Sequence, residues 1–331
     1  MATQETQVLD NIIASRRALL VGGGAALAAL ALTRPAAAAS TVTSYTDNDI
    51  LNFALNLEYL EANFYYLAAF GTNISTANSL YPIGAGVMGI TGVGTQGSVV
   101  TKSTTCKVPF TSLQVASYCV ETAIEEGKHV AFLRSALGSA AVAQPQIDLL
   151  NSFNALASLA GIGPAFDPFA SDATFLIGAY IFEDVGVTAY HGAAPLITNK
   201  STILPAAAGI LAVEAYHAGL VRTSINALDP TGALGLLGYT QKISAVRTGA
   251  AQAAATTKVT DDFGLQIQNV SLGGSANVTA TTIVDADPTN VVAFSRTTTQ
   301  VLNIVTGGNA TTSGAAAKGV FFPNGLNGLF S

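Results

Sequence analysis

Charged residues are scarce in this 331-residue chain, since Asp, Glu, Lys and Arg make up 10% of it and hydrophobic residues make up 50%. The formal net charge is −6 at pH 7, and no basic run longer than a pair of arginines occurs. Nucleic acids and anionic membranes are bound through basic patches, so we expect neither as a partner. With so few charges, Ala, Ser, Thr, Asn and Gly must cover much of the surface.

Cysteines and long apolar runs are also scarce. Cys106 and Cys119 allow at most one disulfide, between a loop and the helix after it, and two buried free thiols fit the sequence equally well. Beyond residue 39, no charge-free apolar run without Gly or Pro approaches the roughly 20 residues that a membrane-spanning helix needs. We therefore expect no stable membrane span in the mature chain.

The N-terminus has the pattern of an export signal. Ser15-Arg16-Arg17-Ala18-Leu19-Leu20 resembles the twin-arginine motif, an apolar stretch follows to Leu32, and Ala37-Ala38-Ala39 offers a cleavage site before Ser40. The alternative is a membrane anchor, for which the apolar stretch is short. We predict that the twin-arginine export machinery recognises residues 1–39 and that the mature protein is periplasmic or extracellular. Twin-arginine substrates cross the membrane folded, often with a cofactor, which favours a bound metal.

Helical periodicity and end signals predict four long helices. The first begins at Thr46, which forms a capping-box variant with Asp49, and it stops at Gly71. The four predicted helices cover residues 46–69, 112–137, about 173–191 and 203–228. Four helices of this length predict an all-α four-helix bundle.

The segments around these helices have a different composition. Residues 72–110 are rich in Gly, Thr and Ser and are predicted to be a long inserted loop. The weaker predictions are a short helix over residues 146–159, a hairpin over 265–284, a fifth helix from Asp287-Pro288 through Asn303 and a loop-like tail over 307–331. The chain is thereby divided into a signal peptide at 1–39, a bundle at 45–230 and a mixed extension packed on the bundle at 231–331.

Histidine occurs only three times, and two of the three follow a glutamate by three residues. Residues spaced by three share one helix face, so a carboxylate and an imidazole can converge on one point inside a bundle. These pairs are Glu126 with His129 in the second helix and Glu214 with His217 in the fourth. The other two long helices each supply one glutamate, Glu58 and Glu183.

The neighbours of these six residues are apolar, as Leu57 and Phe182 illustrate. Burying four carboxylates without a cation would be very costly, so the set predicts bound metal. Glu121 and Glu125 are interpreted as solvated instead. His191 lies eight residues beyond Glu183, too far for the same metal pair, and is interpreted as structural or near an access path.

An internal repeat distinguishes two candidate glutamates on the first helix. Glu58 and Glu183 are each followed seven residues later by a tyrosine, Tyr65 and Tyr190. Aligning the two helices on this pattern places a glycine against Glu61, so Glu58 is the better ligand. Glu61 is left as an extra ligand, a hydrogen-bond partner of a ligand or a carboxylate paired elsewhere.

The spacing of the two halves supports the repeat. The lone glutamate precedes the Glu-x-x-His motif by 68 residues in the first half and by 31 in the second, and the excess of 37 is close to the 39 residues of segment 72–110. An ancestral two-helix hairpin with an insertion in its first copy explains both spacings. Residues 138–171 would then cross between the hairpins.

A glutamate from each of two helices and a Glu-x-x-His from each of two others is the ligand set of ferritin-like di-iron and di-manganese proteins. Residues 49–65 resemble the opening of the bacterial exported ferritin-like family that includes plant desiccation-related proteins. Phe294-Ser295-Arg296-Thr297 and the segment 321–325 are similar to that family as well. The resemblance implies that Tyr65 and Tyr190 hydrogen-bond ligand carboxylates across the bundle.

The resemblance also implies a pair of Fe or Mn ions that reacts with dioxygen or peroxide in oxidative or desiccation stress. Iron would imply ferroxidase or peroxide-scavenging chemistry, and manganese would imply catalase-like chemistry. The inserted loop and the extension would hinder assembly of a hollow shell, so we do not expect bulk iron storage. The alternative is a non-enzymatic envelope protein whose metal only stabilises the fold. Whether the chain is an enzyme and whether it forms a homo-oligomer are left open.

Overall fold

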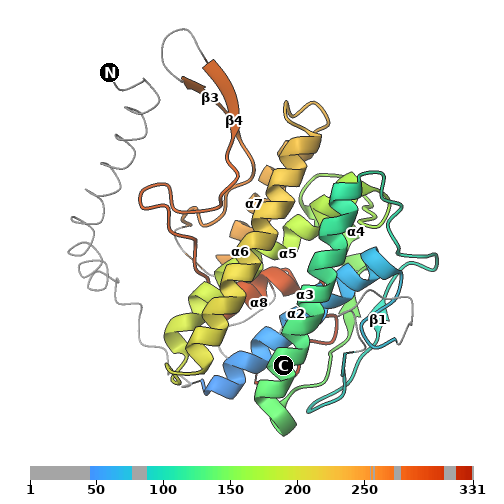
Figure 1. Ribbon diagram of the computed structural model, residues 1–331, viewed down its shortest axis with the longest axis vertical. Coiled ribbons are helices and arrows are strands. Elements are labelled where there is room, and N and C mark those ends of the chain that lie inside the picture. Colours follow the sequence, from blue (N-terminus) through green and yellow to red (C-terminus); the bar gives the residue numbers. More distant parts are fainter. Residues whose placement is uncertain are drawn as a thin grey trace, which may run out of the picture. The chain divides into compact units, whose positions relative to one another are not determined.

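A computed structural model describes residues 45–76, 88–253, 255, 258–271, 277–308 and 318–329. Within it, four long helices form the bundle (Figure 1). They are α2 (Asp47–Phe70), α3 (Leu113–Leu137), α5 (Asp172–Ala193) and α6 (Ile203–Leu228). The predicted signal peptide at residues 1–39 lies outside the described residues.

The long helices begin and end where the sequence signals predict. Thr46 caps α2 in a capping box with Asp49, and Gly71 ends the helix in the left-handed conformation, with φ of 75°. Ser112 caps α3, and Ser171 caps α5. Most of the packing is within two helix pairs, α2 with α3 and α5 with α6, so the bundle consists of two hairpins.

The inserted loop packs along the crossover between the hairpins. Its strand β1 (Val99–Val100) pairs in parallel with β2 (Ile147–Asp148). The short crossover helix α4 (Asn151–Leu159) therefore starts later than the predicted residue 146. The reason is local, because the Asp148 carboxylate accepts hydrogen bonds from the backbone N–H groups of Leu150 and Asn151 and so fixes the helix start.

The described residues of the C-terminal extension form two helices where one was predicted. These are α7 (Leu236–Ala251), which was not predicted, and α8 (Thr298–Thr306). The predicted start of the fifth helix near residue 287 is wrong, because Thr297 and Gln300 form a capping box that starts α8 eleven residues later. The predicted hairpin is present as β3 (Ile267–Ser271) paired antiparallel with β4 (Asn277–Thr281).

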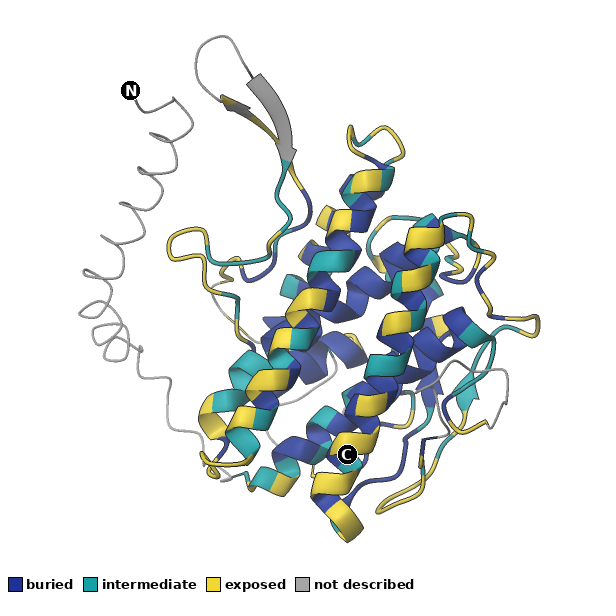
Figure 2. Cartoon of the chain, in the orientation of Figure 1, coloured by how far each residue is buried: buried dark blue, intermediate teal, exposed yellow. Residues whose placement is uncertain are grey.

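The extension is fastened to the bundle by a buried network of ion pairs. Both α7 and α8 pack against α5, which is buried along most of its length (Figure 2). Asp184 of α5 lies 2.9 Å from Arg222 of α6 and 2.9 Å from Arg247 of α7. Arg247 and Arg296 both contact Asp262 of the extension, at 2.7 and 3.0 Å. One network therefore joins α5, α6, α7 and the segment before α8.

Two features bear on redox state and membrane association. Cys106 and Cys119 are buried free thiols. The structure therefore agrees with the alternative of two free thiols and not with a disulfide. Among the described residues, α6 is long and apolar enough to cross a membrane by length and composition alone. Its charged side chains, Glu214 and Arg222, are buried against the rest of the protein.

Candidate metal centre

The structure brings the six predicted ligands together in the middle of the bundle. Each of the four long helices contributes to the cluster, and every member is at most 9% exposed. The members are Glu58 of α2, Glu126 and His129 of α3, Glu183 of α5, and Glu214 and His217 of α6. The four long helices thus bring four carboxylates and two imidazoles together in one buried cluster.

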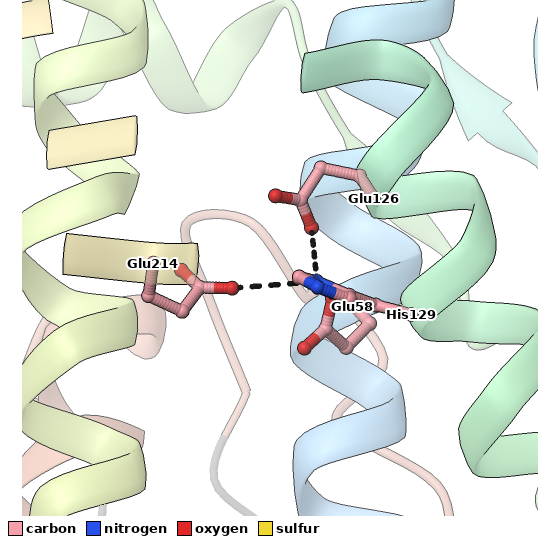
Figure 3. A group of neighbouring side chains, drawn as sticks. All are labelled: Glu58, Glu126, His129 and Glu214. Atoms are coloured by element: carbon pink, nitrogen blue, oxygen red, sulfur yellow. Dashed lines mark ion pairs between the residues drawn. The ribbon is translucent and has the colours of Figure 1, made fainter. Parts of the chain in front are cut away.

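The six residues form two overlapping groups of potential ligands. One group is Glu58, Glu126, His129 and Glu214, shown in Figure 3, and the other is Glu126, Glu183, Glu214 and His217. Within each group, one oxygen or nitrogen of every residue lies within 4.8 Å of the others. Glu126 and Glu214 belong to both groups, so they stand where carboxylates could bridge two ions.

Distances from the imidazoles define the two halves of the centre. The Nδ1 atom of His129 lies 3.3 Å from Glu58 Oε2, 3.4 Å from Glu126 Oε2 and 3.6 Å from Glu214 Oε1. The Nδ1 atom of His217 lies 2.9 Å from Glu126 Oε1 and 3.5 Å from Glu183 Oε2. Both histidines therefore turn the same ring nitrogen towards the carboxylates.

Orphaned polar atoms show that the cluster fits metal ions. Apart from the imidazole–carboxylate contacts within the cluster itself, eight buried side-chain atoms of the six residues have no hydrogen-bond partner, including both oxygens of Glu126 and of Glu214 and the Nδ1 atoms of both histidines. Leaving a buried polar atom unpaired costs about 1–3 kcal/mol, and more for a charged group. Carboxylate oxygens and imidazole nitrogens are the donors that iron and manganese accept. Two divalent ions would also balance the four negative charges.

The electrostatics of the metal-free cluster show the same demand for positive charge. Burial raises the pKa of Glu58 to about 7. Burial and repulsion from Glu126 raise the pKa of Glu214 well above its ordinary value. Burial alone would lower the pKa of His129, but the carboxylates of Glu58 and Glu126 raise it to about 12. The surrounding carboxylates likewise raise the pKa of His217, so both rings favour the protonated form without metal, and metal binding competes with protons.

Two tyrosines hold the outer glutamates from across the bundle. The hydroxyl of Tyr65 on α2 donates a hydrogen bond to Oε1 of Glu183 on α5. In the mirror arrangement, the hydroxyl of Tyr190 on α5 donates to Oε1 of Glu58 on α2. Each bond occupies one oxygen and leaves Oε2 facing the centre, so the tyrosines orient the glutamates as the family resemblance implied.

Glu61 lies beside the cluster but belongs to neither group. It is 6% exposed, and burial together with repulsion from Glu214 raises its pKa well above the ordinary value. Gly186 occupies the position equivalent to Glu61 in the second copy of the repeat. Because it has no side chain, the Glu214 carboxylate fills the space beside it, and a Cβ atom there would overlap Glu214 Oε2. The preference for Glu58 over Glu61 as a ligand stays a prediction.

The interpretation of Glu125 as a solvated side chain is wrong. Its carboxylate, 38% exposed, accepts a hydrogen bond of 2.7 Å from Nε2 of His217. A proton fixed on Nε2 leaves Nδ1 of the neutral ring free as a ligand. The only hint of this role in the sequence is that Glu125 directly precedes Glu126. The spacing of residues along one helix does not show which residue of another helix lies beside them. His191 is structural, with Nδ1 at 3.1 Å from the Phe294 carbonyl oxygen.

Comparison with known proteins places this arrangement in a family. The profile of the ferritin-like domain matches residues 46–227, which include all four bundle helices. The chain belongs to the ferritin-like domain family. It is also 28% identical over 270 residues to the desiccation-related protein PCC13-62 of Craterostigma plantagineum, which covers 79% of this chain and 78% of that protein. No solved structure matches the chain significantly. The predicted all-α ferritin-like fold is confirmed.

One further acidic group lies outside the ferritin-like centre. Asp184, Asp262 and Asp285 are close enough to hold an ion by distance alone. Two of them already pair with the buried arginines Arg222 and Arg247, which supply the positive charge. Burial and the other two aspartates raise the pKa of Asp285 to about 8. This group therefore belongs to the ion-pair network that fastens the extension.

Proposed function

We propose that this is an exported ferritin-like protein whose core binds two iron or manganese ions and reacts with dioxygen or peroxide in oxidative or desiccation stress. The observation that carries the proposal is the set of eight orphaned carboxylate and imidazole atoms that face one another inside the bundle. A protein that needed only a stable core would fill this space with apolar side chains.

Each ligand has a distinct task in this proposal. Glu58 with His129 would hold one ion, Glu183 with His217 the other, and the two glutamates shared by both groups would bridge them. When bound, such a pair supplies electrons to, or accepts them from, an oxygen-containing substrate. The tyrosine hydroxyls keep the outer glutamates in place, and the burial of all six ligands keeps bulk water away.

Metal content and turnover of the purified protein test the proposal. We expect two ions per chain after anaerobic reconstitution and consumption of ferrous ion or hydrogen peroxide by the loaded protein. His129→Ala and Glu214→Ala should each abolish binding of the pair, whereas Glu61→Ala should keep at least one ion. A wild-type protein that binds no metal would refute the proposal. Retention of both ions in Glu58→Ala together with their loss in Glu61→Ala would refute the choice of Glu58.

The second candidate is a non-enzymatic protein of the cell envelope that protects during desiccation, with metal that only stabilises the bundle. It is favoured by the similarity to a protein named as desiccation-related and by the low content of charged residues. Two bound ions without turnover of ferrous ion or peroxide would select this function. Loss of thermal stability on chelation, with no other measurable activity, would agree with it.

Export is supported by the N-terminal sequence. Arg16 and Arg17 with the following apolar stretch are the features that twin-arginine machinery reads. Replacing both arginines by lysine should retain the protein in the cytoplasm, as measured by cell fractionation. An Arg34→Lys control, which lies close to the predicted cleavage site, should leave export unchanged. Export of the double lysine variant at the normal rate would refute the twin-arginine route.

A further inference from the structure

An open groove runs between α3 and α6 and ends on one ligand of the centre. Its volume is about 650 Å³, and its lining includes Glu121 and Glu125 from α3 and Tyr216 and His217 from α6. In the view of Figure 1, these two helices run along the same side of the bundle. The opposite pair, α2 and α5, is covered by α8 on the side of α5.

His217 forms the floor of this groove. Its side chain is 1% exposed, and its two ring nitrogens face in different directions. Nε2 lies 2.7 Å from the half-exposed carboxylate of Glu125 on the groove side, whereas Nδ1 lies 2.9 Å from Glu126 Oε1 in the centre. The imidazole ring of His217 thus lies between the solvent in the groove and the Glu126 carboxylate in the centre.

The charge of the groove suits a cation. Glu121 and Glu125 lie one helical turn apart on α3, and both line the groove, whereas none of the described residues that line it is Lys or Arg. Glu121 is exposed, Glu125 is partly exposed and Glu126 is buried. Carboxylates therefore continue from the surface to the centre, and fields of one sign in a cleft raise the local concentration of the opposite ion.

The internal repeat does not reproduce Glu125 in its second copy. Alignment of the two Glu-x-x-His motifs places Val213 opposite Glu125, so the position that supplies a carboxylate to His217 in one copy holds an apolar side chain in the other. The pocket on the other face, between α2 and α5, reaches Glu58 and Glu61 but is otherwise lined almost entirely by apolar side chains. Among the described residues that line this approach, carboxylates occur only at its inner end, at Glu58 and Glu61, so a hydrated cation meets none on the way in.

We infer that divalent metal ions reach the centre through the groove between α3 and α6, with Glu125 as the transfer ligand that passes them around His217 to Glu126. This inference rests on the proposed di-metal function. In the transfer, the incoming ion takes the place of the His217 N–H at the Glu125 carboxylate. The imidazole can then turn away from Glu125, and the ion moves one carboxylate inwards.

Uptake of Co²⁺ by metal-free protein, followed by its visible absorption in a stopped-flow instrument, tests the inference without reference to turnover. Glu125→Gln removes the charge but keeps an oxygen that can accept the His217 N–H. We expect it to slow uptake about tenfold, at the low end of electrostatic effects on association rates, and Glu121→Gln to slow it by about two- to threefold. The final stoichiometry at saturating Co²⁺ should equal that of the wild type, because the Gln oxygen still accepts the His217 N–H.

Two controls separate the outcomes. Asp167→Asn removes an exposed carboxylate outside the groove and should leave the rate unchanged, and added salt should slow the wild type more than Glu125→Gln. Normal uptake rates in both glutamate variants would overturn the inference. So would an altered spectrum with a normal rate in Glu125→Gln, because Glu125 would then only position His217. Absence of Co²⁺ binding in the wild type would instead refute the proposed function.

Discussion

The crossed tyrosine bonds can be tested by Tyr65→Phe, which removes one hydroxyl and leaves the aromatic packing in place. In the metal-free protein this hydroxyl donates to the buried carboxylate of Glu183. A hydrogen bond to a charged group is worth about 1.5–3 kcal/mol, and one to a neutral group about 1 kcal/mol. Burial raises the pKa of Glu183 and so favours the neutral form. We therefore expect a loss of about 1–2 kcal/mol in the free energy of unfolding.

The mirror bond gives an internal comparison. Tyr190→Phe removes the hydroxyl that donates to Glu58, so its cost should agree with that of Tyr65→Phe within about 1 kcal/mol. Tyr216→Phe is the matched control, because Tyr216 is 73% exposed and its change should stay within about 0.5 kcal/mol.

Urea denaturation in the presence of a chelator measures these free energies. A double-mutant cycle of Tyr65→Phe with Glu183→Gln isolates the pair, and we expect a coupling of about 1 kcal/mol. In the metal-loaded protein, loss of an outer hydrogen-bond partner should weaken metal affinity by about 10- to 100-fold. Zero coupling together with unchanged metal affinity would refute the view that the tyrosines hold the glutamates.

Three other perturbations give distinct outcomes. Gly186→Ala should lower the metal content below two ions, because its new carbon would displace the Glu214 carboxylate, and elemental analysis checks this. Arg247→Met should cost about 3–5 kcal/mol in urea denaturation, since it removes one of the two arginine partners of both Asp184 and Asp262, and a cost under about 1 kcal/mol would contradict this. In metal-free protein, the pKa of Glu58 is raised by burial from 4.5 to about 7, so its contribution to stability is present at pH 4.5 and lost as the pH rises through 7. The free energy of unfolding should fall by about 3 kcal/mol between pH 4.5 and 8 from this group, and Mn²⁺ should reverse the fall.

The bundle and its ligands were predictable because their signals are local. The capping box of Thr46 with Asp49 and the left-handed Gly71 set the ends of α2 within the helix itself. The three-residue spacing of Glu126 and His129 places both on one face whatever else the chain does. Helical periodicity and motif spacing were therefore enough to predict the four long helices and the convergence of the six side chains.

The extension was harder to predict because its structure depends on distant partners. Helix α7 follows a glycine with φ of 80° and has no side-chain cap, so its sequence gives little sign of a start. It is held instead by Arg247, which reaches Asp184 and Asp262 in other segments. The role of Glu125 was missed for the same reason, since its partner lies 92 residues away on another helix.

The surroundings of the centre support the proposed reactive metal pair over the proposed purely stabilising one. Structural metal sites are typically closed by protein ligands, whereas catalytic sites keep an open position. Here a carboxylate-lined groove ends at His217 on one face of the bundle, and a largely apolar pocket ends at Glu58 and Glu61 on the opposite face. A metal that only stabilised the bundle would need neither approach. Two approaches of contrasting polarity suit a centre that takes up a cation from one side and a small uncharged molecule, such as dioxygen, from the other.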